Sequence, residues 1–479
     1  MSITEDELRK FVEEEKWQQA SQGIRQFVNE RMTPQVAILG AEIFFHYEQY
    51  ETAKDFIQWG LTIEPTNYEL YYMLGNYYSH LNHDQAYLCY ENAWNLGKDS
   101  EDEDFLKETA ISYIKEYEVK VNRVAIAIAS YNSAEITKNL IGSIRATCLE
   151  GSYEICVADN ASEDGIAEWL EQQPDVKLVR NSSNEGFAKA SNQAVLLAEK
   201  DSDIFFLNND TILLPNSLFW LRMGLYENET VGATGSVTNN AGNGQKISLQ
   251  CNSLMEWLQE GTSLNVPIDQ PYEKKLMLVG YAMLVRRKVI DEVGMFDTIF
   301  GMGNYEDNDL GVRIVQQGYQ LILCHNSFVF HYGSMGFRKN TSLNYSELLD
   351  MNRKVYKDKW GYDSDYYANA RMDIIKNIPD SSESAFRVLE VGCGAGATLI
   401  KIQYMWPNSE VKGIELVSEV AKLGANYVDI MEGNCETMNI PYDKGYFDYI
   451  IFGDVLEHLL DPDATLRRFR PYLKKMVVC

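Results

Sequence analysis

The chain has 479 residues, 45% of them hydrophobic, which is enough for about two to four domains with buried cores. Its formal net charge of -27 argues against a nucleic acid or an anionic membrane as the main partner, because both favour lysine and arginine. The eight cysteines lack the C-x-x-C spacing of a zinc site, no signal peptide precedes them, and no apolar run reaches the roughly 18 residues of a membrane span. The sequence therefore predicts a cytoplasmic protein without a transmembrane segment.

Residues 1–118 carry a helical repeat. Ala20, Ala53 and Ala86 recur at a constant interval, and a small residue at fixed spacing lets paired helices approach closely. We therefore expect stacked helical hairpins, and the pattern resembles tetratricopeptide repeats. Such an array is either a scaffold or a docking surface for a protein partner or acceptor, and both interpretations stay open.

Residues 119–365 alternate buried-strand patterns with helix patterns. Strand-like runs at 124–132, 155–164 and 204–210 each end in polar residues, and helix-patterned stretches at 135–145 and 188–198 lie between them. This alternation predicts an α/β domain with a mostly parallel sheet. Because ligands bind at the carboxyl ends of the strands of such a sheet, the polar residues are expected to converge on one substrate.

Eight motifs occur in order in this domain. They are SYN at 130–132, ADNASEDG at 158–165, NSSNEGFAKASNQA at 181–194, LNNDT at 207–211, GYAMLVRR at 280–287, VGMFD at 293–297, YEDNDLGVR at 305–313 and FHYGS at 330–334. Together they resemble the family 2 glycosyltransferases of GT-A fold, above all the rhamnosyltransferase-like branch. The resemblance implies transfer of a sugar from a uridine- or thymidine-diphosphate donor to a hydroxyl group.

The departure of a nucleoside diphosphate requires positive charge on its phosphates, which a divalent cation supplies. Asp210 is expected to bind Mg²⁺ or Mn²⁺, and Asn208 and Asn209 stand where the family often has Asp-x-Asp, so their oxygens are expected to help through water or the ribose. The resemblance also implies that His331 binds the metal or the diphosphate. The alternatives are a capped turn around Asp210 and a packed core histidine.

The proposed catalytic base is Asp307. Direct displacement at the anomeric carbon needs a carboxylate that takes the proton of the acceptor hydroxyl, and the expected outcome is inversion. Glu306 and Asp309 compete for this role, and Asp309 and Gly280 are placed on the acceptor side. The alternative is an acidic helix start, where carboxylates favour the positive end of the helix dipole.

The nucleotide is expected to contact residues after the first two strands. Tyr131, with Asn132, could stack on or edge the base, and Asp159 could accept a hydrogen bond from a pyrimidine N–H, as the resemblance implies. Gly186 and Asn192 are expected to shape the loop beside the diphosphate. The alternatives are an Asx-turn at Asp159 and a packing role for Asn192 inside a helix.

Residues 380–479 begin with a strand pattern and the glycine-rich turn VLEVGCGAGATL at 388–399. With YFDYIIFGDVLEHLLDP at 446–462, this region resembles class I S-adenosylmethionine-dependent methyltransferases, which implies cofactor binding by Glu390, Gly392, Gly394, Gly396 and Glu415. The sheet is expected to stop at a fifth strand near 474–479, so methyl transfer is left open while cofactor binding is retained.

The fold class expected for the whole chain is multidomain: an all-α repeat region, a Rossmann-like GT-A domain and a partial methyltransferase-like α/β domain. The expected function is inverting, metal-dependent glycosyl transfer to a surface glycan or to a surface protein such as flagellin, which rests on analogy. Two alternatives remain, a repeat-based interaction protein with degenerate catalytic domains and a bifunctional glycosyltransferase and methyltransferase.

Overall fold

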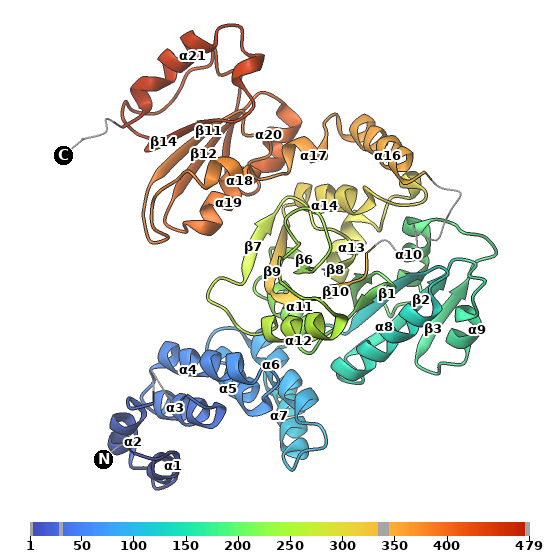
Figure 1. Cartoon of the computed structure of the whole chain (residues 1–479), viewed down its shortest axis with the longest axis vertical. Coiled ribbons are helices and arrows are strands. Elements are labelled where there is room, and N and C mark those ends of the chain that lie inside the picture. The colour runs from blue at the N-terminus through green and yellow to red at the C-terminus, as the bar shows by residue number, and fades with distance from the viewer. Residues whose placement is uncertain (1–2, 28–31, 334–343, 475–479) are drawn as a thin grey trace.

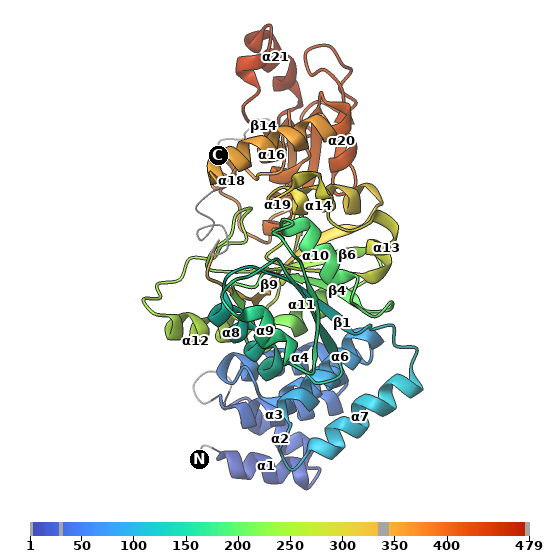
Figure 2. The same cartoon turned by 90° about the vertical axis from the view of Figure 1, so that its right-hand side faces the viewer.

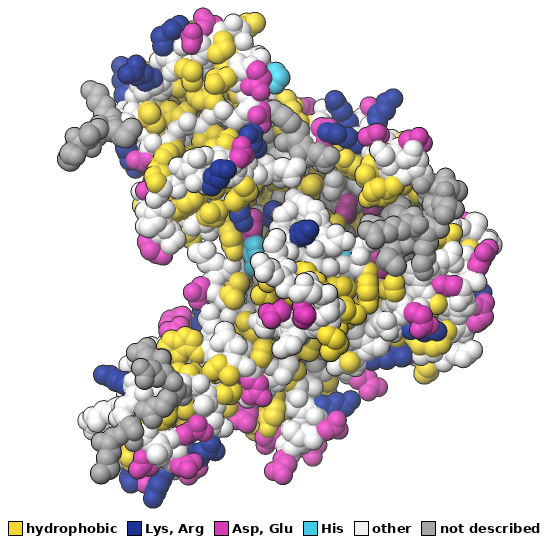
Figure 3. Space-filling view, viewed as in Figure 1, with side chains coloured by type: hydrophobic (Ala, Val, Ile, Leu, Met, Phe, Trp, Pro, Cys, Tyr) yellow, Lys and Arg dark blue, Asp and Glu magenta, His cyan; other side chains and the backbone are white. Residues whose placement is uncertain are grey.

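The computed structural model describes residues 3–27, 32–333 and 344–474, apart from the side chains of residues 365 and 366. Three parts follow one another along the long axis of the molecule, with helices at one end, a large sheet in the middle and a smaller α/β region at the other end (Figures 1 and 2). Between the two outer parts the molecule is hollowed on one side (Figure 3). In the described part of the chain the cysteines are free thiols, and no helix combines the length and apolarity that a bilayer crossing requires.

The helical region is built from helix pairs. Its elements are α1 (Glu5–Glu13), α2 (Trp17–Ile24), α3 (Pro34–His46), α4 (Tyr50–Ile63), α5 (Tyr68–Tyr78), α6 (His83–Leu96) and α7 (Glu103–Glu116). Ala20, Ala53 and Ala86 lie at equivalent positions of α2, α4 and α6, one turn after each helix begins, and all three are fully buried. The expected helical hairpins are therefore present, whereas the resemblance to tetratricopeptide repeats stays a prediction.

The central part is an α/β domain. Its elements are β1 (Val124–Ser130), α8 (Ala134–Thr147), β2 (Tyr153–Asp159), α9 (Ile166–Glu171), β3 (Val176–Arg180), α10 (Phe187–Val195), β4 (Asp203–Leu207), β5 (Thr211–Ile212), α11 (Ser217–Leu225), β6 (Val231–Val237), α12 (Leu254–Leu264), β7 (Tyr272–Lys275), β8 (Ala282–Val285), α13 (Arg287–Val293), η1 (Thr298–Phe300), α14 (Glu306–Gln316), β9 (Gln320–Phe328), β10 (Phe330–His331) and α16 (Tyr345–Trp360).

The large sheet of this domain has eight strands in the order β3-β2-β1-β4-β8-β6-β9-β7. The four strands at one end are parallel, as the alternation of strands and helices predicts, and β6 is parallel to β9. Strand β8 runs antiparallel to both of its neighbours, and β7 runs antiparallel to β9, so the sheet is mixed. A second, two-stranded sheet joins β10 to β5, and it brings the His331 region to the end of β4.

Helix α11 is buried along its whole length, because it packs against β6 and β9 on one side and against α6 of the helical region on the other. Its Arg222 forms a buried ion pair with Glu91 of α6. Beside this pair, Gln85 donates to the carbonyl of Met223 at 2.9 Å. The helical region is thus fastened to the central domain by polar contacts inside an apolar interface.

The last part contains α17 (Ser364–Tyr367), α18 (Met372–Ile375), β11 (Arg387–Val391), α19 (Ala397–Met405), β12 (Glu410–Glu415), α20 (Ser418–Gly424), β13 (Asp429–Glu432), β14 (Tyr449–Phe452), η2 (Leu456–His458), α21 (Pro462–Phe469) and η3 (Arg470–Tyr472). Its four described strands are parallel in the order β13-β12-β11-β14. The fifth strand expected near 474–479 falls almost wholly outside the described residues.

This last part covers the free edge of the large sheet, since α19 packs along β7. At the centre of the contact, Glu273 of β7 is 2% exposed. Its carboxylate is 2.8 Å from Nζ of Lys401 on α19, 2.7 Å from Nε2 of His325 on β9 and 3.6 Å from Nζ of Lys275. One buried carboxylate therefore connects three elements from the two parts.

Candidate active site

The most distinctive pair of polar atoms lies where β10 meets β5. His331 is 8% exposed, and its Nε2 lies 3.2 Å from Oδ1 of Asp210, without the geometry of a hydrogen bond. The other ring nitrogen, Nδ1, lies 2.8 Å from the carbonyl oxygen of Asn240. A carbonyl only accepts, so Nδ1 carries a proton, and Nε2 is the ring nitrogen that faces the carboxylate of Asp210. An imidazole nitrogen and a carboxylate oxygen held this close can both bind a metal cation.

The ring of His331 is fixed by residues that sequence reasoning did not single out. The Tyr281 ring stacks on the imidazole with centroids 5.0 Å apart, and its hydroxyl bonds the backbone of Ser236 at 2.6 Å. The side chain of Asn239 accepts from the backbone N–H of His331 and donates to its carbonyl. The only sequence signal was that Tyr281 follows Gly280 inside a motif.

The asparagines before Asp210 have different surroundings. Asn208 Oδ1 is buried and has no hydrogen-bond partner within the described residues, and its backbone N–H donates to the carbonyl of Tyr281 at 2.9 Å. Asn209 instead donates to Oγ1 of Thr137 on α8 at 3.1 Å. Asn208 is thus available to a ligand, whereas Asn209 fixes the loop to a helix.

Among the described residues no group of three or more His, Cys, Asp or Glu side chains is arranged to hold a metal ion. Asp210 and His331 would be two protein ligands, with the neutral oxygen of Asn208 nearby in sequence. Mg²⁺ commonly binds one or two protein ligands and completes its shell with water and substrate phosphates. The residues present therefore fit a cation that arrives with a diphosphate.

The loops that follow β1 and β2 are bonded to each other. Asp159 accepts from the backbone N–H of Ser162 at 3.1 Å, which is the turn that the alternative interpretation predicts. Its second oxygen, Oδ1, is buried without a partner among the described residues, so the turn leaves one acceptor for a ligand. Asn132 accepts from the N–H of Glu163 and joins the two loops, while Tyr131 is half-buried beside it.

Asp307 lies at the start of α14 and is half-buried. Burial raises its pKa, and the N–H groups of Gly280, at 2.8 Å from Oδ2, and Asn308 partly offset this rise. Glu306 is 5% exposed, and burial together with the charge of Asp307 places its pKa well above the usual range. The two shifts favour the protonated form of Glu306 and raise the basicity of Asp307.

Gly280 lies against the proposed base. A Cβ at this position would lie 3.1 Å from Cβ of Asp307, and the acceptor-side role of this glycine stays a prediction. The absence of a side chain lets the backbone approach and donate its N–H to the carboxylate. Since the next residue, Tyr281, stacks on His331, one short segment connects Asp307 to the Asp210 pair.

The backbone before α14 is strained. Asn304 and Tyr305 both adopt left-handed conformations, with φ of 75° and 76°, which are uncommon outside glycine. The side chain of Asn352 on α16 donates to the carbonyls of Phe300 and Gly303, each at 2.8 Å, and holds this turn. Single-sequence reasoning did not identify Asn352, because its partners are distant in the chain.

Asp309 is fully buried and already engaged. Its oxygens lie 2.9 Å from Nε of Arg313, 2.6 Å from Nζ of Lys359 and 3.0 Å from Nε1 of Trp360. These contacts favour an internal ion-pair role over the acceptor-side role expected from the sequence.

Two further predicted residues shape the backbone. Asn192 on α10 pairs with the backbone of Phe296 through two hydrogen bonds of 2.8 and 3.1 Å, which is the packing role of the alternative interpretation. Gly186 has a φ of 86°, and a Cβ there would lie 2.2 Å from the carbonyl oxygen of Gly301. Both residues thus fix the segment that leads to α14, and their place beside a diphosphate stays a prediction.

The glycine-rich turn after β11 has the expected backbone. Gly392, Gly394 and Gly396 all have positive φ, of 69°, 57° and 82°. Glu415 accepts from the N–H of Gly394 at 2.8 Å and from that of Val417 at 2.9 Å, and a second lone pair on each oxygen is left for ribose hydroxyls.

Glu390 lies on β11 below this turn. Burial raises its pKa to about 8, and its Oε2 has no hydrogen-bond partner among the described residues. A Cβ on Gly394 would be 3.0 Å from the Tyr367 ring of α17, so a side chain from this chain already touches the turn. The turn, the acid after β12 and the unpaired Glu390 oxygen fit a nucleoside cofactor.

The comparisons with known proteins match the central part and the last part of the chain to two different families. The family model "Glycosyl transferase family 2" matches residues 125–294. The central part is a family 2 glycosyltransferase domain. The model "Methyltransferase domain" matches residues 362–479, so it begins at the helices before β11. The glycosyltransferase domain and the methyltransferase domain are therefore adjacent in one chain.

Two curated relatives reflect the same division. The chain is 27% identical to an "Uncharacterized glycosyltransferase YfnE" of Bacillus subtilis (strain 168) over 239 residues, which are 41% of this chain and 61% of the relative. It is 24% identical to a "Malonyl-[acyl-carrier protein] O-methyltransferase" of Bacillus cytotoxicus over 117 residues, which are 23% of this chain and 41% of the relative. The chain thus spans less than two thirds of each relative.

Two solved structures resemble parts of this chain with low TM-scores. A crystal structure of GalNAc-T7 with UDP, GalNAc and Mn²⁺ has a TM-score of 0.38 and 16% identity, covering 50% of this chain and 49% of that one. The plantazolicin methyltransferase BpumL in complex with SAH has a TM-score of 0.18 and 20% identity, covering 19% of this chain and 35% of that one.

Proposed function

We propose that the glycosyltransferase domain transfers a sugar, with inversion, from a uridine- or thymidine-diphosphate donor to a hydroxyl of a glycan or protein acceptor. The observation that carries the proposal is the His331–Asp210 pair, in which Nε2 and Oδ1 lie 3.2 Å apart and can both bind one cation. Asp159 and Asn208 add buried oxygens without partners in the described chain, after β2 and after β4, two strands that flank β1. Such a set of acceptors at strand ends suits a ligand rich in donors and bound cations.

The residues of this chain have separate tasks in the proposed reaction. Asp210 and His331 would hold Mg²⁺ or Mn²⁺, and a bound divalent ion supplies charge stabilisation to a departing diphosphate. Asp307 takes the proton of the acceptor hydroxyl at its carboxylate, and the N–H of Gly280 keeps that carboxylate in place. The raised pKa of Glu306 favours its protonated form, in which the carboxyl group can donate a hydrogen bond beside the base.

The direct test uses isosteric variants that keep the packing. Purified wild type, D307N and D210N are assayed for donor hydrolysis and transfer with uridine- and thymidine-diphosphate sugars in the presence of Mn²⁺. Loss of the base is expected to lower kcat by about 10²- to 10⁴-fold, and loss of Asp210 is expected to remove the response to added metal. The matched control is D291N, a change of an exposed aspartate on α13. Wild-type turnover in both D307N and D210N would overturn the mechanism.

The methyltransferase domain favours a second function. We propose that the methyltransferase domain binds S-adenosylmethionine through the turn at 392–396 and Glu415, which makes the chain bifunctional. The supporting observations are the three positive-φ glycines and the unpaired Oε2 of Glu390. Calorimetry of the full chain with S-adenosylmethionine is expected to show one site that E415A weakens, and the absence of any heat would eliminate this function. A repeat-based interaction protein with inactive domains is the outcome if both assays fail.

A further inference from the structure

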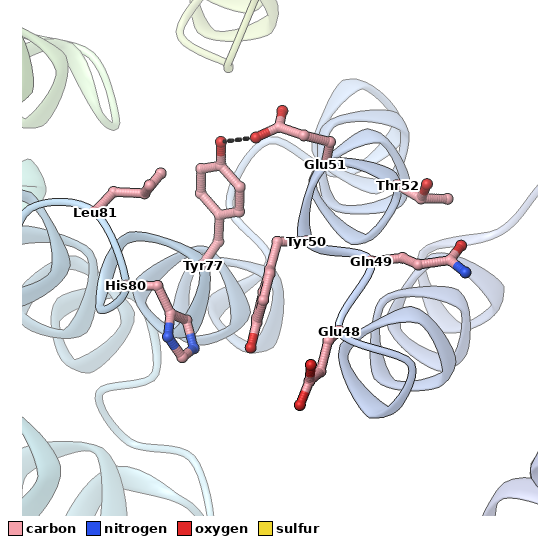
Figure 4. Close-up of a pocket in the computed structure, with 8 residues that line it drawn as sticks. All are labelled: Glu48, Gln49, Tyr50, Glu51, Thr52, Tyr77, His80 and Leu81. Atoms are coloured by element: carbon pink, nitrogen blue, oxygen red, sulfur yellow. Dashed lines mark hydrogen bonds between the residues drawn. The ribbon is translucent and has the colours of Figure 1, made fainter.

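A cavity of about 380 Å³ lies at the edge of the helical region, far in sequence from both candidate sites. It forms where the turn between α3 and α4 meets the end of α5 (Figure 4). Its lining residues are Glu48, Gln49, Tyr50, Glu51, Thr52, Tyr77, His80 and Leu81. Glu48, Glu51, His80 and Leu81 are exposed, so the cavity is open to solvent.

Aromatic rings form one wall of the cavity. Tyr50 at the start of α4 and His80 after α5 lie with ring centroids 4.5 Å apart, and both rings stand next to Tyr77 in Figure 4. Tyr77 is only 5% exposed, and its hydroxyl donates to Oε1 of Glu51 at 2.8 Å. The face of a tyrosine ring carries negative potential, so a cation placed against it is stabilised.

The charge of the lining is one-sided. It contains the carboxylates of Glu48 and Glu51 and no lysine or arginine. Lys54 stands outside the lining, 4.0 Å from Glu51 and 5.7 Å from the centroid of the Tyr77 ring. This lysine is a cation of the chain itself beside the Tyr77 ring and Glu51, whereas Glu48 forms no ion pair among the described residues. Glu48 also has a φ of 56°, in the left-handed region, which marks the sharp turn that presents it.

The remaining lining residue of note is apolar. Leu81 is 64% exposed at the margin of the cavity, where it can cover the methylene stem of a long side chain. Together the lining matches an arginine side chain. Leu81 offers an apolar surface to the methylene stem, the aromatic rings offer their faces to the flat head group, and the carboxylates offer negative charge to its cation. Guanidinium is planar, stacks on aromatic rings and pairs with carboxylates through two parallel hydrogen bonds, which ammonium does not do.

We propose that this cavity binds an arginine side chain of a partner polypeptide. The cavity is open to solvent and so accessible to a partner, whereas α6 packs on α11 of the glycosyltransferase domain. The site is independent of sugar transfer, and it gives the helical region a docking role in addition to its scaffold role.

The test measures binding to the full chain by isothermal calorimetry and ligand-observed NMR. The probes are a capped pentapeptide with a central arginine between glycines and the same peptide with citrulline, which keeps the shape of arginine without its charge. We expect saturable binding of the arginine peptide that weakens as salt rises, and at least about tenfold weaker binding of the citrulline peptide.

Three variants locate the binding. E48Q/E51Q and Y50A are each expected to weaken binding of the arginine peptide about tenfold or more, whereas Y50F keeps the ring and retains binding. The control is E108Q/E116Q, which removes the same charge from exposed positions of α7. Thermal melts confirm that each variant is folded.

Three results would overturn the proposal. They are equal affinity for the citrulline peptide, an equal loss in E108Q/E116Q, which would indicate general attraction to an acidic protein, and the absence of saturable binding to the wild-type chain.

Discussion

Replacing Glu273 by glutamine tests how the methyltransferase domain is fastened to the sheet of the glycosyltransferase domain. Burial alone would raise the pKa of Glu273, but the hydrogen bond from His325 and the charges of Lys275 and Lys401 outweigh it and lower the pKa from 4.5 to about 2. That drop corresponds to roughly 3 kcal/mol of stabilisation of the folded state at neutral pH. Because the folded pKa lies below the unfolded one, this stabilisation is complete above pH 4.5 and is lost as the pH falls through about 2.

The assay is denaturant-induced unfolding of wild type and E273Q from pH 7 down to pH 3, with limited proteolysis of the segment between the two domains. At pH 7 the variant is expected to be less stable by roughly 3 kcal/mol, and the difference is expected to shrink to less than about half by pH 3, because the carboxyl group of the unfolded wild-type chain binds its proton between pH 4.5 and 3 while the folded one stays ionised. E419Q, at an exposed position of α20, is the charge-matched control and is expected to behave as wild type. A difference below about 1 kcal/mol at pH 7, or one that does not change with pH, would refute the role given to Glu273.

Three further predictions concern the two sites. Gly280→Ala places a Cβ 3.1 Å from Cβ of Asp307, so kcat is expected to fall about tenfold or more with an unchanged melting temperature, and full activity would contradict the positioning role of this glycine. Tyr281→Leu removes the ring stacked on His331 and is expected to weaken Mn²⁺ binding in the presence of uridine diphosphate about tenfold in calorimetry, whereas Tyr281→Phe keeps the ring and the affinity. Burial raises the pKa of Glu390 from 4.5 to about 8, so ionisation destabilises the folded state as pH rises between these values, and the melting temperature of E390Q is expected to gain on that of wild type across this range. If the melting temperatures of the two proteins changed with pH in the same way, the raised pKa of Glu390 would be contradicted.

The sequence predicts individual helices and strands, but it does not predict which strands lie next to one another in the sheet. Uninterrupted apolar runs such as 124–130 predict buried parallel strands, and these strands lie where expected. Strand β8, which separates β4 from β6 and makes the sheet mixed, leaves no mark in local periodicity, because its partners are chosen by the tertiary fold. Helix α10 ends at Val195, three residues before the expected end at 198.

The candidate site shows the same limit at the level of side chains. Asp210, His331 and Asp307 were identified by residue type and motif order, and the structure connects them through 280–281. A single sequence does not reveal that Asn192 bonds a backbone 104 residues away or that Asp309 is surrounded by cations, since such partners are set by packing. The roles of Asn240 and Tyr281 were not predicted for the same reason, because a contact to a backbone carbonyl and the stacking of a ring have no sequence motif.

The covering of β7 by α19 has a consequence for how the chain is maintained. A last strand with bare N–H and C=O groups invites other molecules to add strands to it, which leads to aggregation. In this chain the methyltransferase domain shields that strand. Removing the domain by truncating the chain between residues 361 and 386 is therefore expected to lower the solubility of the protein, even if the domain transfers no methyl group. The methyltransferase domain can thus be retained by selection as a protective cover.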